Sequence, residues 1–294
     1  MSPKGLLYLK LLGSVFFWGG TWIAGRVLAG HLTPYSAAFL RFFFATIFMF
    51  FLVCRTTGRM PRCEKRDILP LAFLGLTGVF LYNILFFSGL KTLTAGRAAL
   101  IIAATPTFIA LGSAVFFKDR FTPAKGLGLL LALTGVSTII GHGNPLSILT
   151  EGASFGDLCI IGCVFSWAAY SLGGKPVMAR VSPIESVYWA CLFGAIMLLP
   201  TALYNGLITE LAVVTATDMV CILFLAFLGT GLAFSWYCEA IREIGPAKTG
   251  IFINLVPVAA IIMGAFMLGE QVDMFLVVGG ILTISGVWIT NRSR

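Results

Sequence analysis

The sequence GSVFFW at residues 13–18 returns as GCVFSW at residues 162–167, a shift of 149 residues. Other pairs keep this shift or one of 151 residues: Gly25 with Gly174, Pro34 with Pro183, Arg97 with Lys248, Pro106 with Pro257, Asp119 with Glu270, Gly128 with Gly279 and Gly135 with Gly286. Matches at two nearly equal offsets indicate that the chain consists of two copies of one ancestral unit.

The chain is strongly apolar, since 59% of its 294 residues are hydrophobic and only 11% are charged. Soluble domains carry about 25% charged residues, so a soluble protein is excluded. An apolar run of about 20 residues crosses roughly 30 Å of hydrocarbon as a helix. Such runs are expected at residues 6–28, 34–54, 67–90, 94–117, 123–141, 155–179, 183–204, 216–241, 246–268 and 272–291. The predicted fold is an all-α polytopic membrane protein with ten transmembrane helices.

The two copies are expected to occupy residues 1–141 and 155–294, with five spans in each. Because five is an odd number, the second copy must lie upside down in the membrane relative to the first. Inverted repeats of this kind surround a central binding site in many secondary transporters.

The basic residues are divided unevenly between the two sides of the membrane. Sixteen of the 20 Lys and Arg residues fall on the side that holds both termini. The positive-inside rule therefore predicts cytoplasmic N- and C-termini. Since the net charge of +8 is explained by this rule, no nucleic-acid partner is predicted. The longest loops, at residues 55–66 and 142–154, are too short for a separate domain.

Two prolines fall in the middle of the fourth and ninth spans, Pro106 and Pro257. Each removes one backbone donor and leaves the carbonyl four residues earlier, at Ile102 or Ile253, without its helical partner. Such groups are tolerated in a membrane where they face protein or a watery cavity. The pair is therefore predicted to mark helix breaks with a gating role, with a kink kept for packing as the alternative.

Polar and aromatic side chains at mid-membrane depth are few, and they are the candidates for substrate contact. Aromatic residues at this depth lie away from the membrane interfaces where Trp and Tyr normally gather. A buried amide or indole requires a hydrogen-bond partner, which is either a neighbouring helix or a ligand. The predicted substrate-binding residues are Trp18, Tyr82, Asn83, Phe86, Trp167, Tyr170, Trp236 and Asn254.

Acidic residues and His are absent from the centre of every predicted span, which argues against a proton carrier or a cation site there. Arg41 lies seven residues into the second span and could attract an anion, but long basic side chains usually extend to the membrane interface. Cys159 and Cys163 are one helical turn apart without a nearby His, so no metal site is predicted. The sequence also lacks the HExxH, GxSxG and P-loop motifs, and we predict no enzyme activity and no cofactor.

In the repeated Gly-x-Val-Phe-x-Trp segments, the Pro34-to-Arg41 stretch and the paired Pro106 and Pro257 elements, the chain resembles the EamA branch of the drug/metabolite transporter superfamily. The similarity covers the whole chain, and it extends to bacterial exporters of aromatic amino acids. This resemblance implies a location in a bacterial inner membrane. The resemblance implies a basket of ten helices, in which spans one to four and six to nine surround a cavity. Spans five and ten would then form a peripheral support.

The leading hypothesis is a secondary transporter that exports small neutral metabolites, above all aromatic and other neutral amino acids, by alternating access. Its expected partners are this small-molecule substrate and membrane lipid, and the protein is expected to be a monomer or a weak dimer. The alternatives are a carrier of anionic metabolites such as sugar phosphates or nucleotide sugars, a proton-coupled multidrug exporter, and a membrane scaffold that transports nothing.

Overall fold

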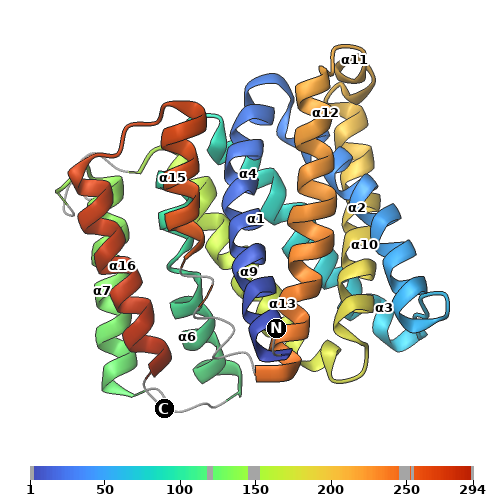
Figure 1. Ribbon diagram of the computed structural model, residues 1–294, viewed down its shortest axis with the longest axis horizontal. Coiled ribbons are helices and arrows are strands. Elements are labelled where there is room, and N and C mark those ends of the chain that lie inside the picture. Colours follow the sequence, from blue (N-terminus) through green and yellow to red (C-terminus); the bar gives the residue numbers. More distant parts are fainter. Residues whose placement is uncertain (1–2, 118–121, 145–152, 245–251, 253–254, 293–294) are drawn as a thin grey trace.

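The computed structural model describes residues 3–117, 122–144, 153–244, 252 and 255–292, and every regular element in these ranges is a helix (Figure 1). The elements are α1 (Pro3–His31), α2 (Pro34–Thr57), α3 (Lys65–Leu74), η1 (Gly75–Leu81), α4 (Tyr82–Leu90), α5 (Ala95–Ile102), α6 (Thr105–Phe117), α7 (Pro123–Ile140), α9 (Phe155–Met178), α10 (Pro183–Tyr204), α11 (Leu207–Leu211), α12 (Ala216–Leu223), η2 (Phe224–Leu232), α13 (Ala233–Ile244), α15 (Val256–Leu268) and α16 (Met274–Arg292).

Eight helical segments in the described ranges are long and apolar enough to cross a membrane, and they match the first eight predicted spans. Shorter apolar helices at Val256–Leu268 and Met274–Ile289 match the ninth and tenth. The prediction of a helical polytopic membrane protein is confirmed.

Two equivalent helices begin in the same way in the two halves. Thr33 caps α2 by accepting a hydrogen bond from the Ser36 N–H group, and Ser182 caps α10 by accepting one from the Glu185 N–H group. A proline follows each cap, where its missing N–H group costs no helical hydrogen bond. The two caps are 149 residues apart, so the repeated sequence sets the same helix start twice.

The third and eighth spans each contain a π-helical segment, η1 and η2 respectively. Both spans were expected to be continuous α-helices. A shift of 151 residues carries η1 onto residues 226–232 of η2. A π turn is wider than an α turn, and π-helical segments are rare and frequently lie at functional sites. Both kinds of helix form from the same apolar residues, so the sequence of these spans could not distinguish them.

Glycines in the two π-helical segments allow close approach of another helix. A Cβ atom at Gly78 would lie 2.4 Å from the ring of Tyr170 on α9, and one at Gly229 would lie 2.6 Å from the Thr21 methyl group on α1. A shift of 151 residues relates Gly78 to Gly229, and a shift of 149 residues relates Thr21 to Tyr170. The same contact between the two halves therefore occurs twice.

Helices α7 and α16 lie side by side at one edge of the molecule, away from the helices around α1 (Figure 1). Their backbones touch at glycines, because a Cβ atom at Gly286 would lie 2.5 Å from the Gly128 carbonyl oxygen and 2.5 Å from the Ala132 nitrogen. This close packing explains why the fifth span has glycines at residues 128 and 135 and the tenth span has them at residues 279 and 286.

Replacement of Gly286 by Ala is expected to lower the melting temperature of the purified protein. The new methyl group meets backbone atoms that cannot rotate away, and overpacking of this kind typically costs about 1–3 kcal/mol. Gly30→Ala is the matched control, since no atom lies within 4 Å of a Cβ at that position. Equal melting temperatures for the two variants would show that α7 and α16 can separate without loss of stability.

Candidate functional site

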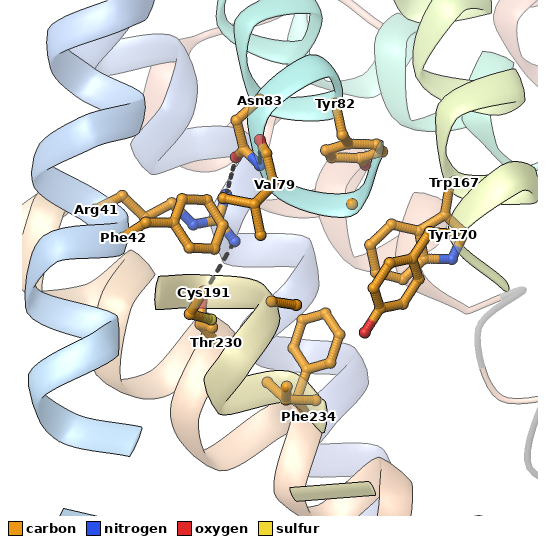
Figure 2. Close-up of a pocket in the computed structure, with 13 residues that line it drawn as sticks. Arg41, Phe42, Val79, Tyr82, Asn83, Trp167, Tyr170, Cys191, Thr230 and Phe234 are labelled. Carbon is orange, nitrogen blue, oxygen red and sulfur yellow. Dashed lines mark hydrogen bonds between the residues drawn. The ribbon is translucent and has the colours of Figure 1, made fainter. Parts of the chain in front are cut away.

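A small cavity of about 40 Å³ lies between the two halves of the chain, with room for a few water molecules. Its walls come from α2, η1, α4, α9, α10, η2 and α13. The lining residues are Arg41, Phe42, Gly78, Val79, Tyr82, Asn83, Trp167, Tyr170, Val187, Ala190, Cys191, Thr230 and Phe234. Figure 2 shows Arg41 together with Phe42 and Asn83 in one part of this site, and Trp167 with Tyr170 in another.

The polar part of the site is built around Arg41, whose side chain is buried with 7% exposure. Its guanidinium donates to Asn83 Oδ1 at 3.0 Å and to Thr230 Oγ1 at 3.3 Å (Figure 2). Its Nε atom has no hydrogen-bond partner. Within the described ranges no carboxylate forms an ion pair with it. Arg41 thus places in the cavity a positive charge for which no described residue is a counter-ion. The expected extension of its side chain to the membrane interface is wrong.

Asn83 and Thr230 are held in place by their own hydrogen bonds. The Asn83 amide nitrogen donates to the Val79 carbonyl oxygen at 2.9 Å, and the Thr230 hydroxyl donates to the Leu225 carbonyl oxygen at 3.0 Å. Both carbonyls belong to the π-helical segments, η1 and η2. The two segments therefore fix the oxygen atoms that surround Arg41.

The aromatic part of the site centres on Trp167 of α9. Its ring stacks on Tyr170 at 5.0 Å between centroids and also contacts Tyr82 at 5.3 Å and Phe234 at 5.8 Å. The four rings lie together on the side of the site away from Arg41 in Figure 2. They offer flat apolar faces that can stack on an aromatic or aliphatic side chain.

Four of the predicted substrate-binding residues line the cavity: Tyr82, Asn83, Trp167 and Tyr170. Three others lie outside its lining. Trp18 packs behind Phe234 at 5.5 Å and donates its indole N–H to the Gly229 carbonyl oxygen at 3.0 Å. Phe86 is 2% exposed and stacks on Tyr82, while Trp236 packs against Phe17. Asn254 lies outside the described residues.

Pro106 lies directly after a break in the fourth span, where α5 ends at Ile102 and α6 begins at Thr105. The Thr105 hydroxyl donates to the Ile102 carbonyl oxygen at 2.6 Å, so the group freed by the proline already has a partner. Pro257 is buried at the start of α15, and Ile253 before it lies outside the described residues. The gating role of the two prolines stays a prediction.

Several lining residues were not among the predicted site residues, although the internal repeat points to them. A shift of 151 residues relates Asn83 to Phe234 and Val79 to Thr230, and all four line the cavity. A shift of 149 residues relates Arg41 to Ala190 and Phe42 to Cys191, which also line it. Applying the repeat to Asn83 would therefore have found Phe234.

The described residues contain no group of three or more His, Cys, Asp or Glu side chains placed to hold a metal ion. Cys163 instead donates its thiol to the Tyr82 carbonyl oxygen at 3.3 Å. The described residues of the cavity can therefore bind a ligand through one cationic group, hydrogen bonds and aromatic ring faces.

A helical membrane fold with a central, partly polar cavity is typical of transporters of small molecules. Residues 4–141 and 154–292 each match the EamA-like transporter family, and the chain belongs to that family. This confirms the resemblance to the drug/metabolite transporter superfamily that the sequence motifs indicated.

The chain is similar to transporters from several bacteria and archaea. The uncharacterized transporter YyaM of Bacillus subtilis is 31% identical over 96% of this chain and 92% of its own length. A probable terminal-alkyne amino-acid exporter of Streptantibioticus cattleyicolor is 30% identical over 80% of this chain and 76% of its own. One crystal structure superposes with a TM-score of 0.66 at 18% identity, covering 97% of this chain and 96% of that one, which shows a shared fold.

Replacement of Asn83 by Leu is expected to destabilise the protein by about 1–3 kcal/mol, because it removes the acceptor of a buried charged donor. The double variant Arg41→Met with Asn83→Leu should cost less than the sum of the two single changes, since no unpaired cation remains. Melting temperatures of the three variants test this coupling. Additive changes would mean that the Arg41 to Asn83 hydrogen bond contributes nothing to stability.

Proposed function

We propose that this transporter exports neutral amino acids, including aromatic ones, across the bacterial inner membrane. The observation that carries the proposal is the buried Arg41 guanidinium, with one donor unpartnered and an aromatic surface beside it. A substrate carboxylate would supply the missing negative charge at Arg41. The substrate side chain would then stack among Tyr82, Trp167, Tyr170 and Phe234. The amino-acid exporter among the relatives supports this substrate class.

The carrier is proposed to work by alternating access, because a cavity of about 40 Å³ is too small for an amino acid. The lining comes from both halves, so a movement of one half against the other enlarges or closes the site. Contacts that such a movement must break include the ion pair of Lys10 on α1 with Glu239 on α13, at 2.8 Å. We place this pair on the cytoplasmic side, together with both termini.

Coupling to protons through the cavity is not part of the proposal, since none of its described lining residues is Asp, Glu or His. Cationic drugs are also disfavoured, because Arg41 would repel them. The transport unit is proposed to be a monomer, as one chain supplies every lining residue that the structure describes. Transport without catalysis is the proposed activity.

Anionic metabolites such as sugar phosphates are the competing substrate class. One observation supports them, the burial of the positively charged Arg41. A phosphate ester carries about two negative charges near neutral pH. Arg41 is the one cation in the described lining, and the facing surface is aromatic rather than polar. A single carboxylate therefore matches the site better in both charge and shape.

Arg41→Gln is expected to reduce phenylalanine counterflow in proteoliposomes by about tenfold or more, because it removes a charge-assisted contact with the substrate. Arg41→Lys should retain part of the activity, since it keeps the charge but loses the planar fork of donors. Arg62→Gln in an exposed loop is the control for net charge. The assay follows labelled phenylalanine into liposomes that contain unlabelled phenylalanine, with no pH gradient.

Normal counterflow by Arg41→Gln would contradict the proposed role of the arginine. Counterflow of a sugar phosphate by the wild-type protein, with none of any neutral amino acid, would replace the proposed substrate with the anionic class.

A further inference from the structure

We propose that the site recognises its substrate by the carboxylate alone, so that monocarboxylates with an aromatic side chain but no amino group are substrates as well. This inference rests on the proposed function, because it concerns the same cavity. It extends the substrate class from zwitterionic amino acids to organic acids that carry a net negative charge.

The first argument is the charge of the lining. Arg41 is the one cation among the described lining residues, and no lining residue is acidic. Its partners Asn83 and Thr230 are neutral, so the site has a net positive charge when empty. A ligand with one negative charge neutralises this site, and a zwitterion also brings a positive charge close to the guanidinium.

The second argument is the shortage of acceptors for an ammonium group, which has three donors to satisfy. Asn83 Oδ1 and Thr230 Oγ1 already accept hydrogen bonds from Arg41. The Thr230 hydroxyl proton is directed to the Leu225 carbonyl oxygen, and the Asn83 amide to that of Val79. Each of these two oxygens keeps one lone pair, but an ammonium that used it would lie beside the guanidinium that occupies the other, and the two cations would repel each other.

The third argument is the position of the aromatic faces, which could otherwise bind an ammonium through cation–π contact. Trp167 and Tyr170 lie on the side of the site away from Arg41 (Figure 2). The ring of Phe42, beside Arg41, already contacts the guanidinium, with Arg41 Cζ 5.0 Å from the ring centroid. The ammonium of an α-amino acid is attached to the carbon next to the carboxylate. When the carboxylate contacts Arg41, the side chain rather than the ammonium reaches the aromatic faces.

The test compares three ligands that share one phenyl side chain: phenylalanine, 3-phenylpropanoate without the amino group, and 2-phenylethylamine without the carboxylate. Binding is measured by titrating the full-length protein in nanodiscs and following its tryptophan fluorescence. The same three compounds then compete with labelled phenylalanine in counterflow. The variants are Arg41→Gln and, as the matched control, Arg62→Gln.

The expected result is that 3-phenylpropanoate binds within about threefold of phenylalanine, and that 2-phenylethylamine binds at least about tenfold more weakly, since it lacks the charged partner of Arg41. Arg41→Gln should weaken both carboxylates by about tenfold or more and leave the amine unchanged. Arg62→Gln should bind all three ligands like the wild type.

The inference is overturned if the amine binds as well as phenylalanine, or if 3-phenylpropanoate binds about tenfold more weakly than phenylalanine, a difference typical of a lost contact to a charged group. The same experiment distinguishes failure of this inference from failure of the proposed function. Binding of 3-phenylpropanoate without binding or counterflow of phenylalanine would reject amino-acid export and keep the carboxylate preference. Absence of binding by all three ligands would reject both.

Discussion

The buried charge of Arg41 is the constraint on which the rest of the site depends. An unpaired cation in a low-dielectric interior is strongly destabilising unless polar groups surround it. Asn83 comes from the first half of the chain and Thr230 from the second, and each bonds the guanidinium. The arginine therefore joins the two halves at the cavity that lies between them.

The π-helical segments explain how the chain supplies those polar groups. Thr230 lies within η2 and Asn83 follows η1 by two residues, and each side chain donates to a carbonyl of the adjoining segment. The same segments carry the glycines that contact Thr21 and Tyr170 on the opposite halves. A movement between the halves must alter these contacts, so the oxygen atoms around Arg41 would move with it.

The number and positions of the helices could be predicted from the sequence, because hydrocarbon requires apolar runs of a fixed length. The expected depth in the membrane also identified four residues of the cavity lining, Tyr82, Asn83, Trp167 and Tyr170. Depth alone does not predict which side of a helix faces the cavity. Trp236 lies on a span that contributes to the cavity and yet packs against Phe17. The burial of Arg41 depends on partners 42 and 189 residues away in sequence, which no local pattern reveals.

The two halves have similar backbones, but the side chains that they contribute to the site differ. The polar groups of the site are therefore distributed unequally between the halves. Arg41 corresponds to Ala190 and Asn83 corresponds to Phe234, so the charged and amide groups come from the first half alone. Two similar halves allow two similar arrangements, one open to each side of the membrane. Because the guanidinium has no counterpart in the second half, a substrate carboxylate would meet the same partner in both arrangements of the proposed transport cycle. Such a substrate would cross the membrane without turning over in the site.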